Sequence, residues 1–216
     1  MSGNHKDIII IGSGGHASVL LDILLQQDAP VIAVSSNETE ISRPIFKRLK
    51  HLQGNDAILA YSPEDVVLVN GVGALPGSAV RAQIHQRFTE LGYRFLTVVA
   101  TSAIVSPFAT LADGVQVLHQ AVIQPGTQVQ ACAVINTKAS VDHDCHIGFN
   151  NHIAPGATLS GQVTTGNNVH VGTGANIIQC VTVGENSVVG AGVTLTKNLA
   201  EQHIVYPARN HVTSRK

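Results

Sequence analysis

The sequence predicts two architectures in succession: an α/β domain over residues 1–97 and an all-β helix of hexapeptide repeats over residues 98–197, followed by a tail over residues 198–216. In the first half, short aliphatic runs alternate with segments of helical periodicity, which is the pattern of a parallel sheet with helices. In the second half, an aliphatic residue recurs at every sixth position. The chain has no Trp, five Phe and three Tyr, so its core is expected to consist of small aliphatic side chains.

The first half is expected to alternate strands with helices. We predict strands at residues 7–12, 30–34, 65–73 and 94–99, helices at residues 12–27 and 77–93, and a loop with a short helix over residues 35–55. In the second helix, Val80, Ile84 and Phe88 share one face, and Gly92 ends the helix. This order of elements indicates a small parallel sheet.

The second half is defined by its six-residue period. Counting by six from Val99 to Leu195 gives seventeen positions, and all of them except Thr165 are Val, Ile or Leu. A small or β-branched side chain follows four residues after most of these positions, and Asn151 is the clearly polar exception. Each hexad therefore predicts one short strand and one corner of a β-helix, with the aliphatic side chain pointing inward.

Composition argues against several functional classes. The formal net charge is −1 and no block of like charge occurs, so no surface for nucleic acid or for an acidic membrane is expected. The apolar run from Ile8 to Ile11 is far too short to span a bilayer, and the first residues lack the pattern of a signal peptide. Cys132, Cys145 and Cys180 form no CxxC pair, which favours reduced thiols and a cytoplasmic location.

The segment GSGGHA is a candidate phosphate-binding turn. Gly12, Gly14 and Ala17 fit the pattern G-x-G-x-x-A after a predicted strand, and such a Rossmann-like turn offers backbone N–H groups and a helix N-terminus to phosphate. A nicotinamide enzyme needs an acid at the end of the second strand, where this chain has Ser35 and Ser36, so NAD is not expected. A helix start without a ligand is the alternative interpretation.

The stretch KASVDHDCHIG holds the strongest candidate for catalysis, because His143 and Asp144 stand in an otherwise apolar repeat. Imidazole titrates near neutrality, so it suits a general base that removes a proton from an attacking nucleophile. Adjacent strand residues point to opposite faces, so Asp144 can reach His143 only if the chain bends between them. A polar corner of the repeat without a catalytic role is the alternative.

A metal site is a competing interpretation of the histidines. His146, His152 and His170 occupy the same place in their hexads, and zinc carbonic anhydrases use histidines on a hexapeptide scaffold. The chain has eleven histidines, so some coincidences of this kind are expected. We therefore favour an interpretation without a metal.

Several motifs together resemble one family of hexapeptide-repeat acyltransferases. They are IIGSGGHA, LVNGVG, RFLTVVATSAIVSP, INTKASVDHDCHIG, NHIAPGATLSG, VVGAGVTLTKN and YPAR, and they extend over nearly the whole chain. The chain resembles the sialic acid O-acetyltransferase family, which includes bacterial N-acetyltransferases acting on nucleotide-linked amino sugars of the bacillosamine and perosamine type. The resemblance implies a left-handed parallel β-helix with three hexads in each coil, a homotrimer, and active sites between neighbouring helices.

The resemblance also assigns roles to individual residues. His143 matches the family's general base, and Asp144 matches the carboxylate that raises its basicity. Gly161, one coil beyond His143, and His152 match contacts to acetyl-CoA, where a backbone donor could stabilise an oxyanion; a glycine that only relieves a tight corner is the alternative. Further matches are nucleotide-sugar contacts at Gly14, Gly15, His16, Ser35, Ser36 and Gly73 and acetyl-CoA contacts at Lys197 and Arg209.

The sequence departs from the family at two places. Many relatives carry acids where Ser35 and Ser36 stand, which leaves the identity of the nucleotide open. In the tail, Val205 and Tyr206 precede the Pro-Ala-Arg segment where relatives usually have a glycine, and a solvated basic tail is the alternative there.

The preferred hypothesis is a cytoplasmic acetyl-CoA-dependent N-acetyltransferase. It acts on the amino group of a nucleotide-linked amino sugar in surface-glycan biosynthesis, with His143 as general base, as a homotrimer and without a metal. O-acetylation of a sialic acid-like sugar is the first alternative. A metal-dependent carbonic anhydrase-like protein or a non-catalytic scaffold is the second.

Overall fold

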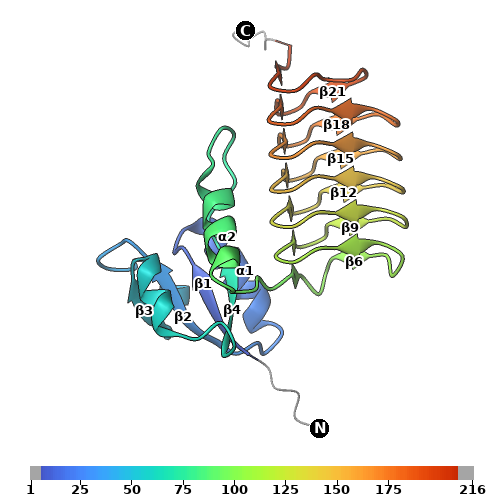
Figure 1. Ribbon diagram of the computed structural model, residues 1–216. Coiled ribbons are helices and arrows are strands. Elements are labelled where there is room, and N and C mark those ends of the chain that lie inside the picture. The colour runs from blue at the N-terminus through green and yellow to red at the C-terminus, as the bar shows by residue number, and fades with distance from the viewer. Residues whose placement is uncertain (1–5, 209–216) are drawn as a thin grey trace, which may run out of the picture.

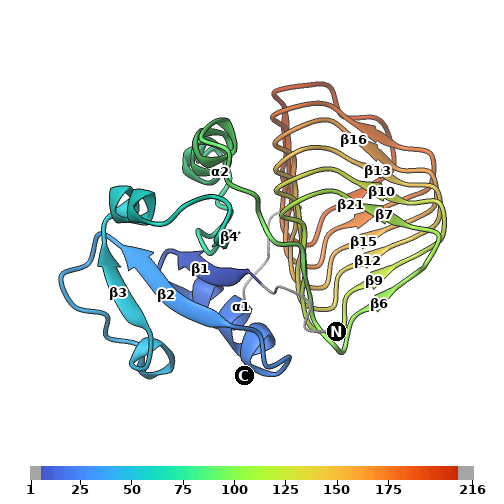
Figure 2. The same cartoon turned by 60° about the horizontal axis from the view of Figure 1, so that its bottom comes forward.

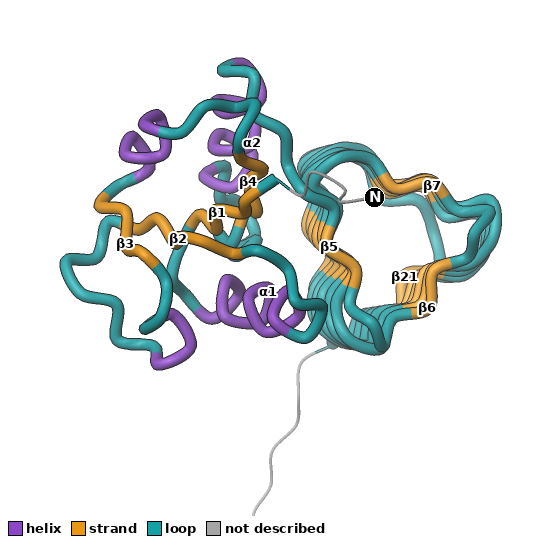
Figure 3. Tube along the Cα trace, turned by 90° about the horizontal axis from the view of Figure 1, so that it is seen from below, coloured by secondary structure: helices purple, strands orange, loops and turns teal. Residues whose placement is uncertain are grey.

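The computed structural model describes residues 6–208 and shows an α/β part followed by a β-helix (Figure 1). The α/β part contains, in chain order, β1 (Asp7–Ile11), α1 (Gly15–Leu25), β2 (Val31–Ser36), β3 (Lys50–Gln53), β4 (Val66–Asn70) and α2 (Val80–Glu90). Its four strands are parallel and ordered β3-β2-β1-β4. Alternate residues of β1 enter two cores on opposite faces of the sheet, so that one face packs against α1 and the other against α2 (Figure 3).

Two parts of this region differ from the sequence-based prediction. The segment 35–55, expected to be a loop with a short helix, contains a short 3₁₀ helix, Pro44–Phe46, but also the edge strand β3, which was not expected. A second 3₁₀ helix, Asn55–Ala60, begins at the last residue of this segment. The segment 94–99, expected to be one strand, pairs with the sheet only through the Leu68–Phe95 bridge and then enters the β-helix as β5. Tertiary pairing overrides the weak local signal of these short segments.

The six-residue period builds a left-handed parallel β-helix with three faces. Face 1 consists of β5 (Val98–Val99), β8 (Gln116–Val117), β11 (Val134–Ile135), β14 (His152–Ile153), β17 (His170–Val171), β20 (Val188–Val189) and β22 (Ile204–Val205). Face 2 consists of β6 (Ile104–Val105), β9 (Val122–Ile123), β12 (Ser140–Val141), β15 (Thr158–Leu159), β18 (Asn176–Ile177) and β21 (Thr194–Leu195). Face 3 consists of β7 (Thr110–Leu111), β10 (Gln128–Val129), β13 (His146–Ile147), β16 (Thr164–Thr165) and β19 (Thr182–Val183).

Residues eighteen apart stack directly on one another, as the pairing of Ser140 with Thr158 shows, so three hexads make one coil. Each predicted aliphatic position is the second residue of a two-residue strand and points into a continuous core. The two polar exceptions in the repeat satisfy each other, because the buried Asn151 donates its amide to the Thr165 hydroxyl at 2.6 Å. Buried polar groups are therefore paired inside the coil.

The α/β part packs on face 1 (Figures 2 and 3). Leu118 and Val134 of the β-helix belong to the same apolar cluster as the leucines of α1. The fully buried Arg81 of α2 joins the two parts, since it donates to the carbonyl oxygens of Asn70 and Val72 and, at 3.3 Å, to that of Cys132. No helix within residues 6–208 has the length and apolar character needed to cross a membrane.

Candidate active site

His143 and Asp144 lie at the corner between faces 2 and 3, in the turn that follows β12. The Asp144 backbone adopts φ 58°, and this left-handed conformation turns its side chain back toward the preceding residue. The His143 Nδ1 atom lies 2.8 Å from the Asp144 carboxylate. The bend that the sequence analysis required is therefore present. Left-handed residues recur at this place in successive hexads, so the corner geometry of the repeat itself brings the pair together.

Gly161 lies one coil further along, against the other nitrogen of the imidazole. A Cβ atom built on Gly161 would lie 2.5 Å from His143 Nε2. The Gly161 backbone is not in the left-handed region, so the close approach of the ring, rather than the turn, is what requires a glycine. The backbone N–H of Gly161 has no hydrogen-bond partner within residues 6–208. The site thus offers an imidazole nitrogen and a backbone donor side by side.

A second glycine of this corner was not among the residues predicted from the sequence. Gly126 lies one coil before Asp144, and a Cβ atom there would collide with the Asp144 carboxylate. The spacing of eighteen residues from Asp144 was the signal that could have identified it. Gly126 and Gly161 together leave the space in which the His143–Asp144 pair fits.

The electrostatics of the corner favour a basic imidazole. The hydrogen bond with Asp144 raises the pKa of His143, and the nearby Asp142 carboxylate acts in the same direction. The side chains of His143 and Asp144 remain 55% and 57% exposed, so a substrate can reach the ring. With Nδ1 on the carboxylate, Nε2 is left to accept a proton.

The glycine-rich turn lies elsewhere, at the carboxyl end of β1. Gly14 caps α1 in an extended conformation, and a Cβ atom there would meet nothing within 4 Å. Gly15 faces the guanidinium of Arg43, whose Nη2 atom lies 3.6 Å from a Cβ built on the glycine. A helix N-terminus with a cation beside it favours an anionic group, so this turn is suited to phosphate.

The remaining residues predicted for the acceptor pocket have mixed environments. Gly73 lies next to the Cβ atom of His16, but the His16 ring turns to face 1 and pairs with Gln116 at 2.7 Å. Burial, reinforced by Arg81, lowers the pKa of His16 to about 4, so this histidine is neutral and sits at the junction of the two parts.

Ser35 and Ser36 are both buried, and their hydroxyl groups bond within the protein. The Ser35 hydroxyl donates to Asn55 Oδ1 at 2.8 Å, and the Ser36 hydroxyl pairs with His51 at 3.1 Å. An acid does stand near the turn, because the Glu38 carboxylate accepts a hydrogen bond from the Ser13 hydroxyl at 3.0 Å. Glu38 was not predicted as a site residue, because acids were expected only at positions 35 and 36.

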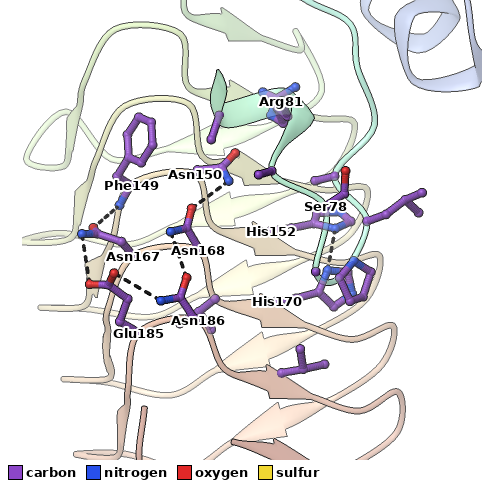
Figure 4. A pocket seen from close by; sticks show the side chains of 18 of the residues that line it. Ser78, Arg81, Phe149, Asn150, His152, Asn167, Asn168, His170, Glu185 and Asn186 are labelled. Atoms are coloured by element: carbon purple, nitrogen blue, oxygen red, sulfur yellow. Dashed lines mark hydrogen bonds between the residues drawn. The ribbon is translucent and has the colours of Figure 1, made fainter. Parts of the chain in front are cut away.

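A cavity of about 520 Å³ lies between face 1 and the loop that leads from β4 into α2 (Figure 4). His152 and His170 line it on neighbouring strands, and Arg81 lines it from α2. Stacked side chains at the corner between faces 3 and 1 complete the wall, namely Phe149, Asn150, Asn167, Asn168, Glu185 and Asn186. Burial lowers the pKa of His152 to about 3 and also lowers that of His170, so both rings are neutral.

The predicted site residues thus fall into separate groups within one protomer. His143, Asp144 and Gly161 share the corner between faces 2 and 3, which is the corner opposite face 1, whereas His152 and the acceptor residues lie on the face 1 side (Figure 3). Lys197 is exposed after β21, and Arg209 lies outside the described residues. His146 is on face 3, away from His152 and His170, and no cluster of three or more His, Cys, Asp or Glu residues between positions 6 and 208 could hold a metal.

Comparisons with known proteins match both parts of the chain. Residues 7–88 match the family described as the PglD N-terminal domain, and residues 162–197 match the bacterial transferase hexapeptide family. The acetyltransferase domain of PglB from Neisseria gonorrhoeae is 30% identical, with a TM-score of 0.83, over 90% of this chain and 93% of that one. The same domain in complex with acetyl coenzyme A gives 29% identity and a TM-score of 0.85, over 93% of this chain and 95% of that one.

PerB from Caulobacter crescentus, solved in complex with CoA and GDP-perosamine, is 28% identical with a TM-score of 0.84, over 92% of this chain and 93% of that one. Likeness extends over both parts of the chain and over nearly the full length of these structures. The chain therefore belongs to the family of hexapeptide-repeat acetyltransferases that carry a PglD-type N-terminal domain.

Proposed function

We propose that the protein transfers the acetyl group of acetyl-CoA to the amino group of a nucleotide-linked amino sugar, as a step in the biosynthesis of a surface glycan. The proposal depends on how the two ring nitrogens of His143 are bonded. Nδ1 pairs with the Asp144 carboxylate, whereas Nε2 lies beside Gly161 and is available to accept a proton. The solved relatives support the two substrates, since one was solved with acetyl coenzyme A and another with CoA and GDP-perosamine.

The geometry supports a direct transfer. An amine attacks a thioester carbonyl only as a neutral nucleophile, and it must lose a proton as the new C–N bond forms. His143 Nε2 accepts that proton, while Asp144 holds the proton on Nδ1 and stabilises the imidazolium that results. In this proposal the N–H of Gly161, which has no partner within residues 6–208, donates to the carbonyl oxygen as negative charge develops there. The thiolate of coenzyme A then leaves.

The α/β part is the proposed binding site of the nucleotide. The carboxyl ends of β1 and β4 form the edge at which ligands bind in open parallel sheets, and the glycine-rich turn with Gly14 and Gly15 lies there. Arg43 adds a cation for a diphosphate, and Glu38 adds a carboxylate for ribose hydroxyls or base N–H groups. We therefore propose residues 1–97 as the acceptor-binding domain and the β-helix as the acetyl-CoA domain.

A second protomer is proposed to complete each site. His143 projects from the corner opposite face 1, while the acceptor residues and His152 lie on the face 1 side, so one chain does not bring base and acceptor together. Exposed apolar side chains on the β-helix, such as Ile104 and Phe108, give a second copy a surface to cover. We propose a homotrimer in which His143 of one protomer serves the acceptor held by its neighbour.

Mixing two variants tests this arrangement, with activity measured at a nucleotide-sugar concentration at which each variant alone has little activity. His143→Ala removes the base and Gly14→Leu damages the acceptor site, and the proposed shared site takes these two parts from different protomers. Mixed trimers therefore contain one site with an intact His143 and an intact Gly14, so co-refolded mixtures should regain part of the activity. Light scattering should show a trimer for both variants. A monomer with full activity, or mixtures that stay inactive although hybrid trimers form, would contradict the shared site.

The cytoplasm is the proposed location, because acetyl-CoA and nucleotide sugars are the substrates and the three cysteines are free thiols.

Release of free thiol from acetyl-CoA, measured against a panel of UDP-, GDP-, CMP- and TDP-linked sugars, tests the activity. Each amino sugar is paired with the analogue that carries a hydroxyl at the same carbon. We expect release with an amino sugar and little with its hydroxyl partner. Equal rates for the pair would contradict N-acetylation, and no release with any nucleotide sugar would contradict the proposal as a whole.

A further inference from the structure

The face 1 cavity contains two histidines on neighbouring coils that the proposed reaction does not use, and their rings lie edge to face. His152 and His170 occupy equivalent positions on β14 and β17, one coil apart, and their Nδ1 atoms lie 3.3 Å from each other (Figure 4). Only one of two facing nitrogens can carry the proton in a hydrogen bond between neutral rings. The surroundings determine which nitrogen that is.

Asn136 sets the proton position on His152. The backbone N–H of Thr137 donates to Asn136 Oδ1 at 2.7 Å, which identifies this atom as the amide oxygen. The amide Nδ2 therefore faces His152 Nε2, at 2.9 Å, and donates to it. A nitrogen that accepts carries no proton, so the neutral His152 ring holds its proton on Nδ1.

The proton position on His152 also determines the proton position on His170. With its proton on Nδ1, His152 donates to His170 Nδ1, and the neutral His170 ring must then carry its proton on Nε2. His170 Nε2 makes no hydrogen bond within residues 6–208, and the residue lines the cavity. Burial keeps the pKa values of both histidines low, so the chain of neutral rings persists at physiological pH.

We propose that Asn136 and His152 act as positioning residues that fix His170 as a hydrogen-bond donor, and that His170 Nε2–H binds an oxygen atom of the sugar portion of the acceptor. The inference rests on the proposed function and extends it to a named subsite. The loop 74–79 leads from the carboxyl end of β4, where the nucleotide is proposed to bind, directly along this cavity. A sugar linked to that nucleotide therefore enters the cavity and meets His170.

The proton positions can be measured without any substrate. Nitrogen-15 NMR of the histidine rings should show His152 protonated on Nδ1 and His170 on Nε2. Asn136→Asp replaces the donor by an acceptor, so His152 should move its proton to Nε2 and His170 should move its proton to Nδ1. Asn176→Asp, on face 2, is the matched control and should leave both rings unchanged. A His170 ring that carries its proton on Nδ1 in the wild type, or that does not respond to Asn136→Asp, would overturn the relay.

Binding measurements test the contact with the sugar. His170→Leu should raise the Kd of the nucleotide sugar selected by the thiol-release panel by about tenfold, the worth of one hydrogen bond to a neutral donor. The Kd of the matching free nucleoside diphosphate, GDP or UDP, should stay unchanged, as should that of acetyl-CoA. His170→Gln keeps an amide donor and should restore most of the affinity, and His146→Leu, at the equivalent position of face 3, is the control.

Three results would overturn this contact. They are an unchanged Kd of the nucleotide sugar in His170→Leu, an equal loss for the free nucleoside diphosphate, or a loss confined to acetyl-CoA. These results differ from a failure of the proposed function, in which the wild-type protein would bind no nucleotide sugar at all. If the wild-type protein binds no nucleotide sugar, His170 has no role in acceptor binding either.

Discussion

Substitution of Gly161 by alanine should inactivate the enzyme without unfolding it. The new Cβ atom would lie 2.5 Å from His143 Nε2, whereas ordinary contacts begin at 3.4 Å, so the imidazole must retreat by about 1 Å. A displacement of that size at a reacting group costs roughly a hundredfold in rate. The Gly161 backbone is not left-handed and the ring that must move is exposed, so the thermal midpoint should change little.

A double-mutant cycle separates this effect from a lost acetyl-CoA contact. Turnover would be measured for wild type, Gly161→Ala, His143→Ala and the double variant, with the KM of acetyl-CoA recorded for each. If the methyl group acts through the imidazole, it should cost about a hundredfold in the wild type and almost nothing in the His143→Ala background. Equal losses in both backgrounds, or turnover within a factor of about three of wild type for Gly161→Ala, would show that the methyl group does not act through the imidazole.

Three further outcomes are expected. Turnover should rise with pH as His143 loses its proton, because the neutral imidazole is the proposed base and its pKa is raised. Asp144→Asn should shift this rise in the pH–turnover profile to lower pH and reduce the maximal turnover. A rise at unchanged pH would mean that another group titrates. Gly14→Leu should raise the KM of the nucleotide sugar and leave that of acetyl-CoA unchanged, because the glycine has open space beside it that a leucine side chain would fill. Parallel changes in both KM values would show that the acceptor does not bind at this turn. Arg81→Met should remove a donor from three carbonyl oxygens, of which that of Asn70 keeps a second donor, the Gln116 amide. The protein should be destabilised by about 3–5 kcal/mol in urea unfolding, and a loss below about 1 kcal/mol would show that Arg81 does not join the two parts.

The hexapeptide repeat allowed most of the fold to be predicted from the sequence. A period that places an aliphatic residue at each strand end fixes the strand positions, and the structure has a strand at every predicted position from Val99 to Leu195. The 35–55 segment was less predictable, because the edge strand β3 has only four residues and a single buried side chain, Leu52. Its pairing with β2 depends on contacts that no local pattern records.

The proposed catalytic corner was also accessible from the sequence, because the eighteen-residue coil places Gly161 and Gly126 against the His143–Asp144 pair. The acceptor region was harder to predict. Which way the ring of His16 turns, and whether the hydroxyl groups of Ser35 and Ser36 are already bonded, depends on Gln116, His51 and Asn55 from distant parts of the chain. Residue type and position do not determine such side-chain partners.

The proposed function is tested most directly by identifying the atom that receives the acetyl group and by asking whether the transfer requires His143. Wild type and His143→Ala would each be incubated with acetyl-CoA and the nucleotide-linked amino sugar, and the product would be followed by mass spectrometry and by the NMR signal of the new amide proton. We expect an N-acetylated nucleotide sugar, formed about a hundredfold to ten-thousandfold more slowly by His143→Ala, which should still fold and bind acetyl-CoA. An acetyl group on oxygen, or a variant that keeps more than about a tenth of the wild-type rate, would contradict the proposed function.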